Sequence, residues 1–70
     1  MTVTQHYVVS GMTCQHCVSS VTEEVSAVVG VTDVAVDLAS GQLTVTSDAE
    51  VAFEEIEAAV DEAGYTVAAA

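Results

Sequence analysis

The sequence of 70 residues predicts an α+β fold in which the elements follow the order β-α-β-β-α-β. Two segments place apolar residues at intervals of three and four, which is the period of an amphipathic helix. Four other segments alternate in polarity or are rich in β-branched residues, as strands are. Apolar residues make up 51% of the chain and proline is absent, so we expect a packed core and not a disordered chain.

The first strand is expected over residues 4–10, where β-branched and aromatic residues precede Gly11. Alternation along this strand places Tyr7 and Val9 on one face and His6 on the other. The apolar face is the one that should contact the helices, so we predict that Tyr7 and Val9 are buried and that His6 faces water.

The first helix is expected to follow a cap at Thr13, because a threonine side chain can accept a hydrogen bond from the first free N–H groups. Gly30 is expected to close the helix in a left-handed conformation. Valines recur at intervals of three and four along it: Val18, Val21, Val25 and Val28. Valine is an indifferent helix former, so this helix depends on burying that stripe.

A hairpin and a second helix come next. Residues 31–38 alternate in polarity, residues 39–42 form a turn, and residues 43–47 form the second strand of the hairpin. Asp48 is expected to cap the second helix, and Gly64 to end it. The apolar stripe of this helix consists of Phe53, Ile56, Ala59, Val60 and Ala63.

A last strand over residues 65–68 completes the order of elements. Two right-handed βαβ crossovers around one hairpin give a ferredoxin-like sandwich: a four-stranded antiparallel sheet with both helices on one face. No linker, repeat or low-complexity tract interrupts the sequence, so we expect residues 1–70 to form a single domain.

The charge of the chain restricts its partners. Eleven carboxylates face no lysine and no arginine, for a formal net charge of −11. Nucleic acid is excluded as a partner because phosphate binding requires cationic side chains, and anionic membrane surfaces are disfavoured for the same reason. A basic protein surface or a cation is the natural partner. Alternatively, the acidity serves only solubility or suits a salty cytoplasm, and the sequence leaves both interpretations open.

The sequence also predicts a cytoplasmic location. Its apolar stretches are far shorter than the ~20 residues that span a bilayer, so direct membrane insertion is not expected. Residues 1–10 lack the cationic and apolar regions of a secretory signal. In a reducing compartment, two cysteines three residues apart are more often a metal or redox pair than a structural disulfide.

Cys14 and Cys17 are the candidate metal ligands. Their spacing places both side chains on one side of a helical turn, at a helix N-terminus whose partial positive charge favours thiolate. Soft thiolate ligands select copper(I), with zinc as the next candidate. A structural zinc site requires four ligands, and no second pair of cysteines exists here. Two ligands suit an exposed site that gives its ion to an incoming thiolate.

Two neighbours of the cysteines are candidates for auxiliary roles. Met12 could supply a thioether ligand, although packing beneath the loop is the interpretation that we favour. His16 lies between the cysteines, where it could add a ligand when two proteins meet, or remain an uninvolved exposed imidazole. The sequence does not decide between these roles for His16.

The sequence GMTCQHC at residues 11–17, between a strand and an amphipathic helix, resembles the heavy-metal-associated domain family. Residues 30–31 and 63–65 are also similar to that family, so the resemblance extends across the chain. Within the family, stand-alone bacterial copper chaperones of the CopZ type are the most similar. The resemblance implies a βαββαβ fold, copper(I) bound by Cys14 and Cys17, and transfer of the ion to the metal-binding domain of a copper-transporting P-type ATPase by ligand exchange.

The resemblance carries two further implications. Family members that serve zinc or cadmium often have an acidic residue before the first cysteine, whereas Thr13 occupies that position here and favours copper. Some relatives place a cation near the site, and this chain has no lysine to do so. Tyr65 occupies the matching neighbourhood. The resemblance favours a role in which it packs beside the loop and screens it from water, and the alternative is that it only fills the edge of the core.

The predicted function is therefore a cytosolic copper(I) metallochaperone and not an enzyme. We favour a stand-alone protein because the sequence begins with methionine and ends soon after its last strand. One alternative is a metal-binding domain excised from the N-terminus of a transport ATPase. Another is a thiol-disulfide oxidoreductase, which would need a thioredoxin-like scaffold. Copper ions bridging exposed thiolates of two copies could also produce a homodimer.

Overall fold

The computed structural model describes residues 2–70 and has the predicted order of elements. These elements are β1 (Val3–Ser10), α1 (Gln15–Ser26), β2 (Val31–Val36), β3 (Gln42–Ser47), α2 (Phe53–Glu62) and β4 (Thr66–Ala69). The strands form one antiparallel sheet in the order β2-β3-β1-β4. The predicted ferredoxin-like fold is confirmed.

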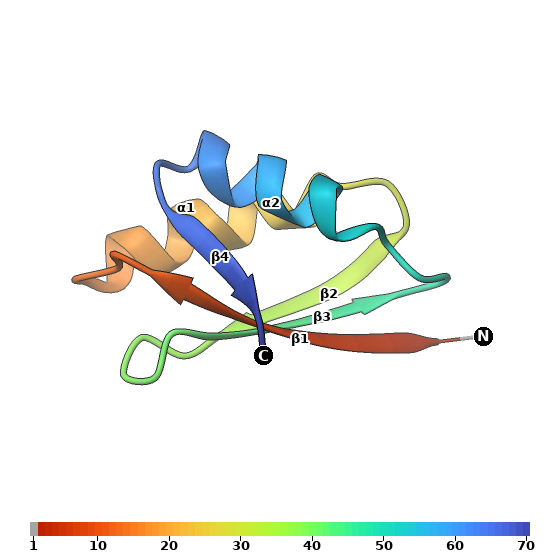
Figure 1. Cartoon of the computed structure of the whole chain (residues 1–70), viewed down its shortest axis with the longest axis horizontal. Helices are drawn as coiled ribbons and strands as arrows, with labels where there is room; N and C mark the ends of the chain where they lie inside the picture. Colours follow the sequence, from red (N-terminus) through yellow and green to blue (C-terminus); the bar gives the residue numbers. More distant parts are fainter. Residues whose placement is uncertain (1) are drawn as a thin grey trace.

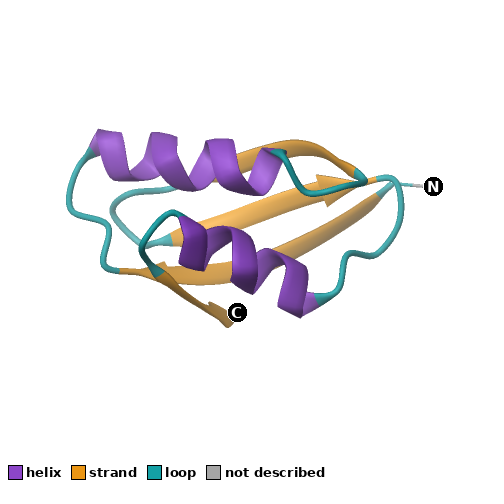
Figure 2. Cartoon of the chain, turned by 90° about the horizontal axis from the view of Figure 1, so that it is seen from above, coloured by secondary structure: helices purple, strands orange, loops and turns teal. Residues whose placement is uncertain are grey.

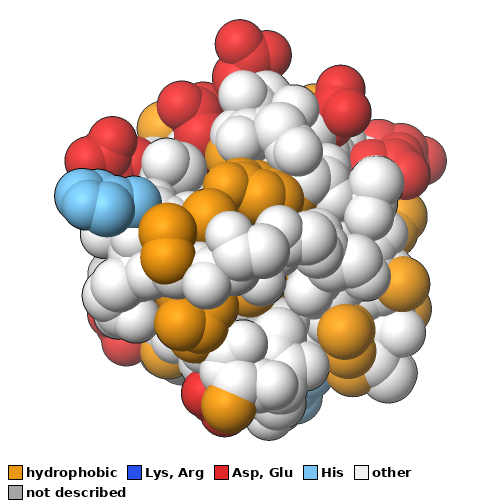
Figure 3. Space-filling view, turned by 90° about the vertical axis from the view of Figure 1, so that its left-hand side faces the viewer, with side chains coloured by type: hydrophobic (Ala, Val, Ile, Leu, Met, Phe, Trp, Pro, Cys, Tyr) orange, Lys and Arg blue, Asp and Glu red, His pale blue; other side chains and the backbone are white. Residues whose placement is uncertain are grey.

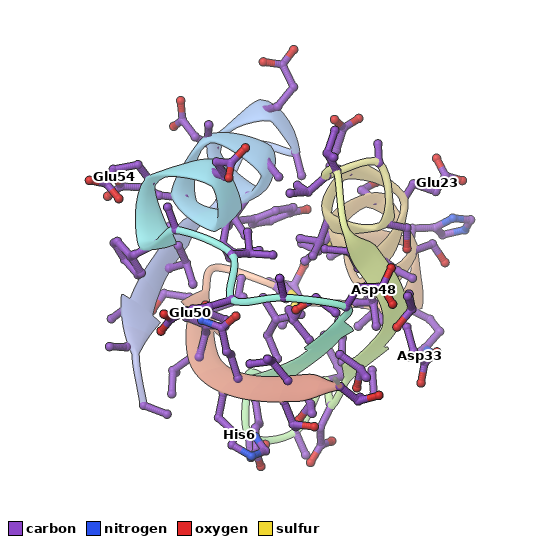
Figure 4. The ribbon with its side chains drawn as sticks, turned by 90° about the vertical axis from the view of Figure 1, so that its right-hand side faces the viewer. His6, Glu23, Asp33, Asp48, Glu50 and Glu54 are labelled. Atoms are coloured by element: carbon purple, nitrogen blue, oxygen red, sulfur yellow. The ribbon has the colours of Figure 1, made fainter. Side chains whose placement is uncertain are left out.

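Both helices cover the same face of the sheet (Figure 1). Viewed from the helix side, α1 and α2 lie next to each other across the strands (Figure 2). In the described part of the chain, residues 2–70, no layer covers the other face of the sheet. His6 lies exposed on that face as predicted (Figure 4), with its Nδ1 3.3 Å from the hydroxyl of Thr44. The apolar residues of the strands and helices therefore meet in a single layer between sheet and helices.

The core confirms the two periodicities that the sequence predicts. Tyr7 and Val9 are each 4% exposed on β1, whereas Val8 between them is 38% exposed. The helices contribute their stripes to the same cluster, whose fully buried members are Val21, Val25, Leu43, Val45, Ile56 and Val60. Burial of such side chains supplies the main driving force for folding.

The start of α1 differs from the prediction. Cys14, and not Thr13, occupies the N-cap position, with an extended backbone and no side-chain cap. The carbonyl of Cys14 accepts hydrogen bonds from the backbone N–H groups of Cys17 at 3.0 Å and Val18 at 3.4 Å. The hydroxyl of Thr13 lies 3.8 Å from the sulfur of Cys17, so its side chain is directed to the thiol and not to a free N–H group.

The end of α1 is also earlier than expected. Gly30 has the predicted left-handed conformation, with φ of +92°, but the helix ends at Ser26. Isolated turns follow, in which Val28 N–H donates to the carbonyl of Val25 and Val31 N–H donates to the carbonyl of Val28. The glycine therefore reverses the chain after these turns and does not terminate the helix itself.

The start of α2 is the largest difference. Asp48 does not cap this helix, because α2 begins at Phe53 and its N-cap residue is Ala52. Asp48 is held at the sheet, where its backbone N–H donates to the carbonyl of Gly30 at 3.0 Å. The intervening residues carry the chain up to the helix layer, and Val51 among them is only 5% exposed within the core.

Boundaries of all four strands also move by one or two residues. β2 ends at Val36 and not at residue 38, because Asp37 begins the turn of the hairpin. Its carboxylate accepts hydrogen bonds from the N–H of Ala39 at 3.1 Å and from the hydroxyl of Ser40 at 3.0 Å. β4 begins at Thr66, one residue later than predicted.

Within residues 2–70, no helix has both the length and the hydropathy that crossing a membrane requires.

Candidate metal centre

The loop between β1 and α1 carries the two cysteines and lies at one end of the molecule, the left-hand end in Figure 1. The turn between α2 and β4 lies at the same end, so residues far apart in the sequence meet there. Gly11 has φ of +99°, and a Cβ atom built on it would lie 3.2 Å from Cδ1 of Tyr65. The absence of a side chain at Gly11 thus lets the ring of Tyr65 lie against the loop.

The sulfur atoms of Cys14 and Cys17 are 3.6 Å apart. This separation is shorter than two metal–thiolate bonds of about 2.3 Å each, so a single ion could contact both. Both cysteines are free, and Cys14 is exposed while Cys17 is half-buried. The pair therefore combines one exposed cysteine with one that is partly shielded.

Hydrogen bonding lowers the pKa of the Cys17 thiol from 9.0 to about 6. The largest contribution comes from the backbone of Thr13, and the Tyr65 hydroxyl and the backbone of Cys14 contribute next, against the opposing effect of burial. These groups stabilise the anion at the start of a helix, where free N–H groups are available. Cys17 is consequently a thiolate, the metal-binding form, at neutral pH.

Tyr65 connects the α2–β4 turn to the cysteines. Its own pKa is raised above the ordinary value, first by the hydrogen bond with Cys17, then by burial and by the charges of the two cysteines. The phenol therefore keeps its proton and remains a donor to the sulfur. The sequence placed Tyr65 in this neighbourhood only by resemblance, and it gave no indication of this hydrogen bond.

Met12 and His16 have different surroundings. Met12 is half-buried and packs against the hydrophobic core. His16 is exposed on the first turn of α1. Across residues 2–70, no three side chains of His, Cys, Asp or Glu converge into a group that could hold a metal ion. The structure thus brings the two cysteines together but adds no third donor of these types.

The surface around the loop has a distinct pattern. Hydrophobic side chains gather at the centre of this end of the molecule, and carboxylates lie along its upper rim (Figure 3). The chain has neither lysine nor arginine. An apolar centre with an acidic rim is suited to contact with a partner of opposite charge.

Comparison with known protein families matches residues 7–66 to the heavy-metal-associated domain. The chain belongs to this family. It is 43% identical over 61 residues to the copper chaperone CopZ of Bacillus subtilis, an alignment that covers 86% of this chain and 88% of that protein. The predicted resemblance to chaperones of the CopZ type is confirmed.

Two further relatives show how widely this heavy-metal-associated domain is used. Copper-transporting ATPase 1 of Rhizobium meliloti is 43% identical over 65 residues, which are 93% of this chain but 8% of the ATPase. The crystal structure of oxidized MerP from Ralstonia metallidurans CH34 superposes with a TM-score of 0.87 at 34% identity, covering 99% of this chain and 97% of that one. The heavy-metal-associated domain is thus found both in proteins of this size and as a small part of a transporter.

Proposed function

We propose that residues 1–70 form a single heavy-metal-associated domain that carries copper(I) and passes it to another protein. Cys14 and Cys17 are its ligands in this proposal, with Met12 and Tyr65 supporting the loop. The observation that carries the proposal is the pair of sulfur atoms 3.6 Å apart, exposed on one side and without a third donor from His, Cys, Asp or Glu in residues 2–70. Carriage of an ion, and not catalysis, is the role that such a site supports.

Copper(I) fits this donor set better than zinc does. Thiolates are soft ligands, which favour copper(I), while zinc sites in proteins are normally four-coordinate. Similarity to a protein named as a copper chaperone supports the same choice of metal.

Transfer would proceed by exchange of sulfur ligands. A thiolate of the partner approaches the exposed side of the site and bonds to the ion while one cysteine of this chain is released. Copper remains copper(I) throughout, because one thiolate replaces another and no electron is transferred. Cys17 is stabilised as an anion by its hydrogen bonds, so it remains a good leaving ligand at neutral pH.

The receiving partner in this proposal is the metal-binding domain of a copper-transporting P-type ATPase, and the exchange takes place in the cytoplasm. Similarity to a transporter of this kind supports the choice, since related domains offer related sulfur ligands. His16, which is exposed beside the site, is available as an auxiliary ligand when the two proteins meet. Copper-bridged pairing of two copies is a further state that the exposed sulfur atoms allow.

A second candidate function is that of a metal-binding domain within a copper-transporting ATPase. The alignment to the Rhizobium ATPase covers 93% of this chain at the same identity as the alignment to CopZ. The site would be the same and only its covalent context would differ. The oxidoreductase alternative, by contrast, required a thioredoxin-like scaffold, and the scaffold here is the βαββαβ fold.

Competition between the reduced protein and a copper(I) chelator tests the proposal. We expect the wild-type protein to remove copper(I) from the chelator, and Cys14→Ser and Cys17→Ser each to lose most of this ability. His16→Gln is the matched control beside the site, and its effect measures whether the imidazole contributes. Wild-type binding no tighter than that of the serine variants would contradict the proposal.

Two further measurements test the details. Repeating the competition with zinc checks the choice of metal. Measuring the mass of the protein at increasing ratios of copper to protein checks for the homodimer.

A further inference from the structure

The outer edge of β4 is a second surface with the features of a binding site. β4 lies at one edge of the sheet and pairs with β1 alone in a regular register. Within residues 2–70, no strand occupies its other side. Open edges add extended segments of other chains unless a bulge, a proline or a charged side chain prevents it. Residues Thr66–Ala69 contain none of these.

The opposite edge of the sheet is different. The register of β2 against β3 shifts between Val31 and Asp33, and the hydroxyl of Thr32 donates to the carbonyl of Thr46 at 3.2 Å. An irregular register and a charged side chain such as Asp33 are features that block pairing at an edge. Of the two edges, β4 is therefore the one that is open to a further strand.

An acidic helix face stands over this edge. A groove of about 370 Å³ lies between α2 and β4, lined by Glu54, Glu57, Asp61, Tyr65, Thr66 and Val67. The three carboxylates are spaced by three and four residues, so they share one face of α2, and all three are exposed. Figure 4 shows Glu54 on the side of the molecule where β4 lies, with Glu23 and Asp33 on the other side.

The groove continues to the metal loop. Asp61, Tyr65 and Thr66 also border a second hollow, whose remaining walls are Ser10, Gly11 and Gly64. Tyr65 at this junction lies against the loop and donates to the thiol of Cys17. A chain segment in the groove would consequently end beside the two cysteines.

Charge decides which kind of segment fits the groove. The chain has no lysine or arginine that could neutralise these carboxylates. A lysine or arginine of a partner would pair with them, and the ring of Tyr65 offers a π-face to the same cation. A second copy of this chain carries a formal charge of −11 and would be repelled.

We propose that the edge of β4 and the overlying face of α2 form a docking groove for an extended segment of the receiving protein that carries arginine or lysine. The segment adds a strand to β4 through backbone hydrogen bonds, and its cations pair with Glu54, Glu57 and Asp61. This inference rests on the proposed function only for the identity of the receiver. The groove, the open edge and the charge pattern belong to this chain alone.

Titration of the isotope-labelled protein with a short capped peptide of alternating arginine and threonine tests the groove by NMR. Alternation places all arginines on one face of an extended peptide. We expect the largest amide shifts in β4 and α2, and no binding of a matched peptide with glutamine in place of arginine. The triple variant Glu54→Gln, Glu57→Gln, Asp61→Asn should weaken binding by roughly fivefold or more, because three exposed ion pairs are lost.

The matched control is the triple variant Glu23→Gln, Glu24→Gln, Asp33→Asn, which removes the same charge from α1 and β2. We expect it to change the affinity by less than about twofold, since exposed charges farther than a Debye length are screened. Equal weakening by both triple variants, or shifts centred on α1 and β2, would overturn the docking groove. Neither triple variant should change the result of the copper(I) competition, because the substituted residues are not metal ligands. Failure of the wild-type protein to bind copper(I) would contradict the proposed function but would not affect the docking groove, which the peptide titration tests separately.

Discussion

Two cysteines separated by only two residues have different surroundings at the metal loop. Cys14 is exposed and caps α1 through its backbone, while Cys17 is half-buried and receives hydrogen bonds from Thr13 and Tyr65. The sequence predicted the pair and its chemistry from spacing. It did not distinguish the two sulfur atoms, because the group that contributes most from outside the loop, Tyr65, lies 48 residues after Cys17 in the sequence.

The lowered pKa of Cys17 predicts how the thiol reacts with pH. Because the thiolate is the nucleophile and its pKa is about 6, alkylation of Cys17 by iodoacetamide should keep its full rate at neutral pH and decline as the pH falls through 6. Tyr65→Phe removes one donor to the anion, so the pKa should rise but stay below 9.0, since Thr13 and Cys14 still contribute. Peptide mapping by mass spectrometry across the pH range measures this rate.

The matched control for this experiment is Tyr7→Phe, which alters the other tyrosine of the chain. Tyr7 is buried in the core and its hydroxyl accepts a hydrogen bond from Gln5. The substitution Tyr7→Phe should therefore leave the titration of Cys17 unchanged. Identical titration of Cys17 in wild type and Tyr65→Phe would show that the phenol does not stabilise the thiolate.

At the scale of elements, the segment before α2 illustrates how a side chain fixes a loop. The side-chain amide of Gln5 on β1 accepts a hydrogen bond from the N–H of Val51 at 3.1 Å and donates to its carbonyl at 3.2 Å. The same amide donates to the hydroxyl of Tyr7 at 2.9 Å. These contacts hold Val51 in the core and satisfy its backbone, so the helix starts after this segment and not at Asp48.

Gln5→Ala should therefore destabilise the fold. It leaves two half-buried backbone groups of Val51 without their partner, and each such loss costs about 1–3 kcal/mol. Urea denaturation followed by circular dichroism measures the change in the free energy of unfolding. Gln42→Ala, at an exposed position on β3, is the control and should change it by less than about 0.5 kcal/mol. Equal effects of the two variants would show that the Gln5 amide does not stabilise the segment.

The turn between β2 and β3 is held against β1 at Gly41, where the two backbones lie close together. Gly41 has φ of +76°, and a Cβ atom there would lie 2.5 Å from the carbonyl oxygen of Val9. The carbonyl of Gly41 accepts a hydrogen bond from the N–H of Val9 at 2.8 Å, so the turn contacts β1 directly. A side chain at this position would push the hairpin away from the central strand.

Gly41→Ala is accordingly expected to destabilise the protein more than Gly30→Ala. Both substitutions place alanine in the left-handed region, which costs about 1–2 kcal/mol. At Gly30, where φ is +92°, no atom beyond the adjacent residues lies within 4 Å of the added Cβ, so only this backbone strain applies. At Gly41 the contact with β1 adds to it. Thermal unfolding of the two variants measures the difference, and equal melting temperatures would contradict the assigned contact.

At the scale of the whole molecule, the unbalanced charge dominates. The structure measures 34 × 20 × 18 Å, and eleven carboxylates share this surface with no lysine or arginine. At about 0.01 M salt the Debye length is ~30 Å, so carboxylates on opposite sides of the molecule still repel one another. At about 1 M it is ~3 Å, and only immediate neighbours interact.

Salt should therefore stabilise the fold. We expect the melting temperature to rise by several degrees between these two salt concentrations, since ~1 kcal/mol corresponds to about 4–8 °C in a domain of this size. The triple variant Glu23→Gln, Glu24→Gln, Asp33→Asn carries three charges fewer and should show a smaller rise. Calorimetry in sodium chloride measures both. A melting temperature independent of salt would show that self-repulsion does not limit stability.

The sequence by itself determined the order of the elements, the buried faces of β1 and both helices, and the position of the cysteine pair. Each of these follows from local periodicity or spacing, which a side chain's neighbours along the chain define. Only the tertiary structure decided where α2 begins, which thiol Tyr65 stabilises, and which edge of the sheet is open. These depend on contacts such as Gln5 with Val51, 46 residues apart. The layers must pack before such contacts exist, so no local pattern encodes them.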